Sequence, residues 1–410
     1  MTGFYIKYSI LFHIIKPDKE AEMQRGILDT SKPEMTVRER FRRQMHFQNI
    51  DKGIHWEFGY LGETIERWHN EGLPKYLERG EGDFSVEEFF GVDKKFIIPV
   101  NCGPLPPFTG EVKILKEEKG KRIEELPDGT IQEVQTEGIR TIPHYIKMPI
   151  SNRDDWKRFK ERLNPETPER ISFDIKRLNE KLRHYPYPVG VNLGSYFGTP
   201  RNWVGFEQIS LMVYDQPDLV EDIIETLTVL YETTLSKVLS EIEVDFAAGW
   251  EDICFRNGPM ISPDMFRKIV APRLKRVTTL LRQHGVDVIW TDCDGNITKL
   301  VPVWLECGVN CMFPLEVHAG SDPVELRKEY GHNILLRGGI AKYQLALGKK
   351  EILNELKRVE KVFEDGGYIP HGDHRIPEDV PYENYRYYIR EKLVMMGWHK
   401  DDIENIEGLK

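Results

Sequence analysis

Two aspartates, Asp292 and Asp294, stand in a pattern that can do chemistry, in the segment VDVIWTDCDGN from Val286 to Asn296. The apolar run before them predicts a buried strand, and residues two apart on a strand point to the same side. Paired carboxylates at a strand end can bind a metal ion or transfer protons. The alternative is that one of them caps the following helix, because Asp-Gly-Asn before ITKLVPVW is typical of a helix start.

Three further clusters of titratable residues follow apolar runs in the same way. Glu251 and Asp252 end DFAAGWEDI and are candidates for acid–base catalysis, for a salt bridge or for a helix cap. Glu316 and His318 lie in MFPLEVHAG, where they are either ligands or hydrogen-bonded strand-end residues. His374 lies in HGDHRIP, where two histidines and an aspartate within four residues favour a functional site over a structural histidine.

Aromatic and charged residues near other strand ends are candidates for lining a substrate pocket. They occur in IHWEFGY, NLGSYFGTP, PLEVHAG and ILLRGGI, each of which continues or follows an apolar run. For any single aromatic residue, the alternative is ordinary packing in the core or at the rim. The predicted substrate-binding residues are Trp56, Glu57, Tyr196, Phe197, His318 and Arg337.

Helical stretches separate these apolar runs, and the layout repeats through the C-terminal half of the chain. A continuous apolar run is typical of a parallel strand that is buried on both faces. A (β/α)8 barrel places its chemistry at the carboxyl ends of such strands. We therefore predict an α/β fold, a (β/α)8 TIM barrel, with its first strand at residues 54–60 and long helices at 217–240 and 263–284.

Two regions differ from this pattern. Residues 1–34 are predicted to be an N-terminal extension, and residues 35–410 to form the barrel. Within the barrel, the run EVKILKEEKGKRIEELPDGTIQEVQTEG alternates apolar and polar residues around turn signals, which predicts an antiparallel β insertion at about 105–150. Helices and strands otherwise alternate without a long polar linker, so we expect a single domain.

The composition excludes several classes of protein. A net charge of −10 and the absence of a basic block argue against nucleic acid as a partner. Five cysteines without a disulfide-type spacing are typical of a reduced intracellular protein. No stretch approaches the ~20 apolar residues that a membrane span needs. We therefore expect a cytoplasmic protein with a small-molecule partner and with no membrane contact.

Several spaced motifs occur in the order found in a known superfamily. They are HFQNIDKGIHWEFGYLGETIERWHNEGLP, EDICFRNGPMISPDMFRKIVAPRLKRV, DCDGNITKLVPVWLECGVNCMFPLEV, GGIAKYQLALGKKEI and GGYIPHGDHRIPEDVPYENY. Together they resemble the uroporphyrinogen decarboxylase-like superfamily from about Met35 onward, most specifically between Trp250 and Tyr385. The resemblance implies a (β/α)8 barrel with its site at the carboxyl ends of the strands, in agreement with the residue patterns.

The departures from the superfamily patterns separate its branches. The decarboxylases carry an arginine-rich N-terminal loop, where this chain has HWEFGY with the acidic Glu57, which argues against a substrate with many carboxylates. The zinc-dependent methyltransferases carry H-x-C and a later cysteine, where this chain has Asp292-Cys293-Asp294 and a segment containing His374. The resemblance thus implies a site for zinc or another divalent metal with harder ligands. The implied ligands are Asp292, Asp294, Glu316 and His374.

The resemblance is closest in character to the corrinoid-dependent methyltransferase branch. It implies metal-assisted transfer of a methyl group between a small methyl donor, such as a methoxy compound undergoing O-demethylation, and a corrinoid (cobalamin) cofactor or corrinoid protein. The implied catalytic residues are Asp292, Asp294, Glu251 and Asp252. Two alternatives stay open: a metal-free carboxy-lyase that uses Asp292 or Asp294, and a barrel that binds a ligand without catalysis.

Overall fold

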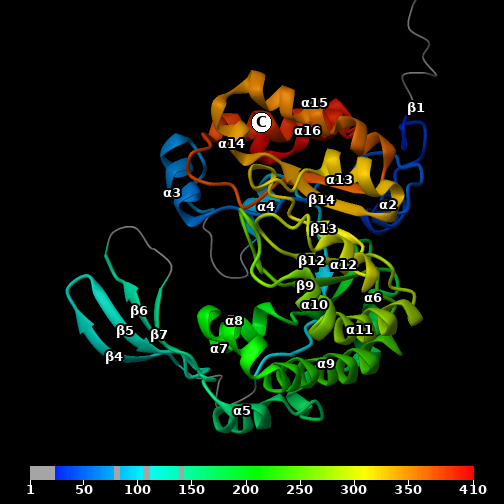
Figure 1. Cartoon of the computed structure of the whole chain (residues 1–410). Coiled ribbons are helices and arrows are strands. Elements are labelled where there is room, and N and C mark those ends of the chain that lie inside the picture. The colour runs from blue at the N-terminus through cyan, green and yellow to red at the C-terminus, as the bar shows by residue number, and fades with distance from the viewer. Residues whose placement is uncertain (1–23, 78–83, 105–110, 138–142) are drawn as a thin grey trace, which may run out of the picture.

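The computed structural model describes residues 24–77, 84–104, 111–137 and 143–410. Its centre is a curled sheet of seven parallel strands with helices on the outside (Figure 1). The strands, in spatial order, are β3 (Phe96–Ile97), β8 (Val189–Gly194), β9 (Phe246–Trp250), β12 (Ile289–Asp292), β13 (Cys311–Phe313), β14 (Leu335–Ile340) and β15 (Tyr368–Gly372). The predicted α/β barrel of the TIM type is confirmed.

Helices connect the parallel strands, as right-handed crossovers require. The long helices α9 and α11 pack against each other, and α9 contacts β8, close to where the sequence predicts them. The α-helices of the described residues are α2 (Val37–Met45), α3 (Gly62–Glu71), α4 (Ser85–Phe89), α5 (Arg153–Lys160), α6 (Ile175–Leu182), α7 (Gly198–Val204), α8 (Phe206–Asp215), α9 (Pro217–Leu239), α10 (Pro263–Ile269), α11 (Ala271–Gln283), α12 (Val301–Glu306), α13 (Pro323–Tyr330), α14 (Lys342–Leu347), α15 (Lys349–Asp365), α16 (Tyr382–Met395) and α17 (Lys400–Asn405). Within the described residues, no helix is long and apolar enough to cross a membrane.

The predicted first strand, residues 54–60, differs from the expectation. It is almost entirely buried, but it forms only an isolated bridge, between Tyr60 and Ile376. Side chains satisfy its backbone instead, because Gln44 accepts from the N–H of Ile54 and Asp93 accepts from the N–H of His55. The segment fills the gap between β15 and β3, so seven strands and one irregular segment enclose the barrel.

The insertion forms a separate antiparallel sheet that extends away from the barrel (Figure 1). Its strands are β4 (Lys113–Glu118), β5 (Lys121–Glu125), β6 (Ile131–Gln135) and β7 (His144–Lys147), in that order. This confirms the antiparallel sheet that the alternating pattern predicts. Two short hairpins complete the strands: β1 (Gln24–Arg25) with β2 (Leu28–Asp29), and β10 (Cys254–Phe255) with β11 (Gly258–Pro259).

Part of the predicted N-terminal extension is attached to the barrel. The side chains of Ile27 and Leu28 are buried, and Ile27 exchanges backbone hydrogen bonds with Ile50 and Glu364. Residues 1–23 of that extension lie outside the described residues. The described part therefore contributes to the same folded unit as the barrel.

Large side chains fill the barrel interior below the strand ends. The cluster combines residues from α2, from segment 54–60 and from the inward faces of the strands, including Trp56, Phe246, Trp290, Phe313 and Ile369. The rings of Phe246 and Trp290 stack with centroids 4.4 Å apart. Because every second residue of a strand faces inward, this aromatic layer also fixes which residues face the barrel mouth above it.

A buried ion pair holds the irregular segment in place. The Lys392 ammonium on α16 contacts the Glu57 carboxylate, and both side chains are 0% exposed. Lys392 also donates to the carbonyl of Trp56 at 3.1 Å, and Tyr388 donates to Glu57 at 2.9 Å. The Glu57 carboxylate thus turns outward to α16 and away from the barrel interior, although the sequence suggests a substrate contact there.

We predict that Lys392→Met destabilises the fold by about 3–5 kcal/mol, because it leaves the Glu57 charge buried without a partner. The double variant Glu57→Gln/Lys392→Met removes both charges and should recover part of this loss. The measurement is the free energy of unfolding from denaturant titration. A Lys392→Met variant as stable as the parent would contradict the assignment of this pair as a closing contact.

Candidate active site

The candidate site lies at the carboxyl ends of β9, β12 and β15. There Asp294 Oδ2 lies 3.3 Å from His374 Nε2, and Asp252 Oδ2 lies 3.5 Å from an Arg201 nitrogen. More than 100 residues separate some of these positions in sequence, and barrel closure brings them together. The expected convergence of Asp292, Asp294 and His374 on one face is therefore observed.

Local backbone geometry sets the positions of the two aspartates. Trp290 is part of the interior cluster, so Asp292, two residues further on β12, faces the same interior side. Gly295 then turns the chain with φ +80°, and a Cβ there would lie 2.8 Å from the carbonyl oxygens of Cys254 and Phe255. The glycine is required by this close approach, and the turn directs Asp294 toward His374.

Asp292 is the carboxyl group whose surroundings most favour proton transfer. Burial raises its pKa to about 7, with further upward contributions from Asp294 and Asp252. Arg337 and His374 act in the opposite direction. No described side chain forms an ion pair with Asp292. A carboxyl group with a pKa near 7 is divided between acid and base at neutral pH, which suits general acid–base catalysis.

Asp294 and His374 form a second titratable pair. The hydrogen bond to Asp294 raises the pKa of His374, because the carboxylate stabilises the imidazolium. The other carboxylate oxygen of Asp294, Oδ1, is buried and has no hydrogen-bond partner among the described residues. His374 also packs its ring edge-on against Phe58, at 5.7 Å between centroids. The pair can therefore hold a proton at the rim of the cavity.

Asp252 has a different environment from Asp292. Its backbone adopts φ +47°, which is uncommon for a residue other than glycine. Arg201 donates to its carbonyl oxygen and lies close to its carboxylate. Burial raises the pKa of Asp252, while Arg201 opposes the shift. This aspartate is thus tied to α7 and faces the pair formed by Asp294 and His374.

Two predicted acidic residues are engaged by local donors. Glu251 accepts hydrogen bonds from the backbone N–H groups of Tyr196, Phe197 and Gly198, at 2.7–2.9 Å. It therefore anchors the start of α7. Glu316 contacts the Lys342 ammonium at 2.8 Å and accepts from the Gly295 N–H at 3.0 Å. Both carboxylates stabilise loops around the site.

The predicted substrate-binding residues fall in three places. Tyr196 and Phe197 are buried, and the Tyr196 ring packs against Tyr231 at 5.5 Å. His318 is exposed at the rim, where its ring meets Tyr343 at 5.6 Å. Trp56 and Arg337 face the barrel interior, with the guanidinium carbon 4.9 Å from the indole centroid. Only this last pair lies below Asp292 in the interior.

The implied metal ligands do not fit a metal centre in this structure. Among the described residues, no three His, Cys, Asp or Glu side chains converge closely enough to hold a metal ion. Of the four implied ligands, Asp294 and His374 contact each other, whereas Glu316 is paired with the Lys342 ammonium. The four predicted ligands therefore lie around one barrel mouth but do not converge on one position. They are Asp292, Asp294, Glu316 and His374.

Two cations of this region were not identified from the sequence. Lys95 precedes β3 and lies 4.8 Å above the Trp56 ring, and Lys342 starts α14 beside Glu316. Lys95 lies in KKFII, directly before an apolar run, and it would have been found by asking which residue of the pair faces inward. Lys342 carries no comparable signal, because it begins a helix.

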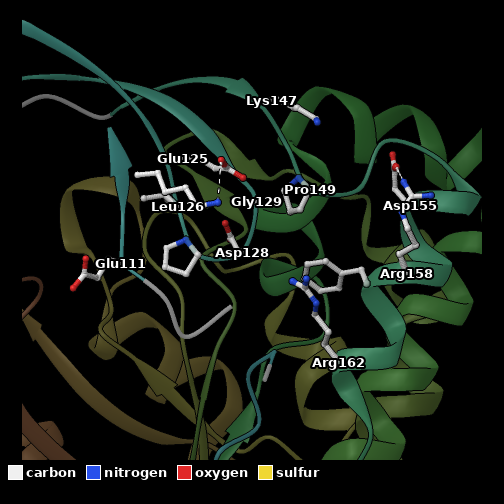
Figure 2. A pocket seen from close by; sticks show the side chains of 13 residues that line it. Glu111, Glu125, Leu126, Asp128, Gly129, Lys147, Pro149, Asp155, Arg158 and Arg162 are labelled. Carbon is white, nitrogen blue, oxygen red and sulfur yellow. Dashed lines mark hydrogen bonds and ion pairs between the residues drawn. The ribbon is translucent and has the colours of Figure 1, made fainter. Parts of the chain in front are cut away.

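A cavity beside the barrel and a cavity beside the insertion differ in volume and in lining residues. One of about 490 Å³ borders Phe58, Lys95 and Ile97, beside segment 54–60 and the start of β3. Glu57 also borders it, but its carboxylate is buried against Lys392. A larger one of about 700 Å³ lies between the insertion and α5, with Asp128, Arg158 and other mixed charges around it (Figure 2). This second cavity is away from the strand ends, and the first does not include Asp292, Asp294 or His374 in its lining.

The raised pKa of Asp292 predicts a pH-dependent gain in stability for Asp292→Asn. An unfolded aspartate has a pKa near 4, so between pH ~4 and 7 the folded chain retains a proton that the unfolded chain releases. Stability therefore falls as pH rises through this window, and the loss is complete at pH 8. The neutral amide removes the loss. The free energy of unfolding of the variant minus that of the parent should therefore be about 2 kcal/mol larger at pH 8 than at pH 5.

The measurement is denaturant unfolding of both proteins at the two pH values. Asp264→Asn is the matched control, because that side chain is 97% exposed. An equal difference between parent and Asp292→Asn at both pH values would show that the pKa of Asp292 is not raised.

Comparison with known proteins agrees with this architecture. A methyltransferase from Methanosarcina mazei has a similar solved structure, with a TM-score of 0.54 and 16% sequence identity over 88% of this chain and 98% of that chain. No curated protein matches the sequence significantly. The family model for uroporphyrinogen decarboxylase (URO-D) matches residues 132–391, which is more than half of the chain. The chain therefore belongs to the uroporphyrinogen decarboxylase family.

Proposed function

We propose that this protein is a methyltransferase that moves a methyl group between a small methoxy compound and a corrinoid held by a partner protein. The observation that carries the proposal is Asp292, a partly buried carboxyl group with a pKa near 7 at the barrel mouth. The family membership and the fold shared with a methyltransferase support it. The departure from the decarboxylase loop at residues 54–60 supports it as well.

The chemistry requires an acid at the ether oxygen. When the bond between methyl carbon and oxygen breaks, its electron pair stays on the oxygen, which leaves poorly unless it gains a proton. Asp292 in its protonated form can supply that proton, which gives the free alcohol or phenol. Arg337 then stabilises the resulting carboxylate, since its positive charge already lowers the pKa of Asp292. A corrinoid would supply the nucleophile that accepts the methyl group.

The pair formed by Asp294 and His374 can assist at the rim. With its raised pKa, His374 keeps a proton that can return to Asp292 after each turnover, directly or through water. Phe58 beside His374 limits the access of bulk water to this pair. In this scheme a proton activates the ether oxygen as a leaving group.

A decarboxylase is the second candidate. The sequence argument against it rests on the charge of Glu57, and Lys392 neutralises that charge. Arg337 in the interior and the exposed Lys95 above the Trp56 ring can also attract carboxylates. Loss of CO₂ leaves a carbanion that must be protonated, a step which Asp292 could also perform. Assays for both reactions on the same preparation separate the two functions.

We predict that Asp292→Asn lowers the rate of methoxyarene demethylation by at least about 100-fold, because general acid catalysis typically contributes that much. The assay follows the demethylated phenol by liquid chromatography, with reduced cobalamin as acceptor and 3-methoxybenzoate or methoxybenzene as donor. Asp264→Asn should leave the rate unchanged. Unchanged turnover in Asp292→Asn would refute the acid role, and release of CO₂ from uroporphyrinogen without demethylation would favour the decarboxylase.

A further inference from the structure

The side chain of Lys95 lies on the inner side of the sheet. Lys95 directly precedes β3, and its Nζ lies 4.8 Å from the ring centroid of Trp56, which belongs to the aromatic layer of the barrel interior. Strand register agrees with this placement. Ile97 pairs with Gly190, and Gly190 pairs with Phe246 of the same aromatic layer. Ile97 therefore faces inward, and so does the residue two positions before it.

Small molecules can reach this inner wall. Lys95 is exposed and Ile97 is 42% exposed, although both side chains face inward. Asn192 on the neighbouring strand β8 pairs with Ala248, which packs against the aromatic layer, and Asn192 is exposed as well. The cavity of about 490 Å³ borders Lys95 and Ile97 together with Phe58. Its volume is in the range of small-molecule sites.

The charge of Lys95 is poorly compensated. The adjacent Lys94 contacts Glu88 at 2.7 Å, whereas no described carboxylate forms an ion pair with Lys95. The indole ring below it compensates an ammonium charge only in part. Burial lowers the pKa of Lys95 to about 8, and the charge of Arg337 contributes in the same direction. At pH 7 about a tenth of such an amine is uncharged, against less than roughly one in a thousand for an ordinary lysine.

We infer that Lys95 is a nucleophilic amine that forms an imine with an uncharged aldehyde or ketone bound in this cavity. The amine lone pair attacks the carbonyl carbon, and one amine proton moves to the carbonyl oxygen to give a carbinolamine. The hydroxyl group then leaves as water with the second amine proton, which gives the C=N bond. An uncharged lysine in a partly desolvated site near another cation is activated for this chemistry. The inference is independent of the proposed methyl transfer, in which Lys95 has no part.

Carboxyl groups of the cavity bear on both the dehydration and the ligand. Loss of water from the carbinolamine requires a proton donor. Glu87 lines the cavity and is the carboxylate whose charge acts on Lys95, so it is placed to carry that proton. Glu57, Glu88 and Asp93 line the cavity as well. Together these carboxyl groups outweigh the charge of Lys95 and disfavour an anionic ligand.

Cyclohexanone is the probe, because it is uncharged and, as a ketone, reacts slowly with ordinary surface lysines. The full chain is incubated with it, treated with sodium borohydride and mapped by peptide mass spectrometry. Borohydride reduces an imine to a stable secondary amine, so we expect one added cyclohexyl group, on Lys95. Labelling should rise with pH around a midpoint near the pKa of about 8, well below that of an exposed lysine.

Lys95→Met should abolish the adduct. Lys94→Met is the matched control, since Lys94 is the adjacent lysine and pairs with Glu88, and it should label like the parent. Glu87→Gln tests the proton donor. Above the pKa of Lys95 this variant should label at least about tenfold more slowly. A purely electrostatic effect of Glu87 would leave that rate unchanged, because removing a negative charge only lowers the pKa of the amine further.

The adduct site and the pH profile of the parent test the inference without any variant. No adduct on the folded parent, equal labelling of Lys94 and Lys95, or a midpoint at the pKa of an exposed lysine would each overturn it. Full labelling of Lys95→Met would do the same. Faster labelling by pyruvate than by cyclohexanone would overturn the assignment of an uncharged ligand.

Discussion

Closure of the barrel depends on an ion pair at the position where the sheet lacks a strand. Segment 54–60 has no ladder of backbone hydrogen bonds, so side chains must hold it between β15 and β3. Lys392 and Tyr388 do this through Glu57, while Gln44 and Asp93 satisfy backbone N–H groups. Burying both charges of an ion pair costs free energy, and the pair is stable only when further hydrogen bonds satisfy its remaining polar atoms. The carbonyl of Trp56 and the Tyr388 hydroxyl complete it here.

This closure determines which way neighbouring side chains face. Glu57 is directed outward to α16, so Trp56 and Phe58, on either side of it, are directed into the barrel. Trp56 then forms one wall for Lys95 and Arg337. The interior charges and the closing pair are thus linked through three consecutive residues. A slip of one residue in this segment would turn the Glu57 carboxylate into the interior, toward Arg337, and away from Lys392.

The sequence predicted what depends on local pattern. Apolar runs ending in polar residues identified β9, β12 and β15, and therefore Asp292 and His374 as neighbours in a barrel mouth. It could not predict partners distant in the chain. Lys392 lies 335 residues after Glu57 and looks like any lysine of an amphipathic helix. Glu316 resembled a metal ligand for the same reason. The sequence does not show that Lys342, at the start of α14, lies beside it.

The interior positive charge bears on how Asp292 can work. Burial alone would favour its neutral form at every step, which would make it a poor acid that does not release its proton to the substrate. Arg337 lowers the energy of the charged form, and His374 holds a second proton at the rim.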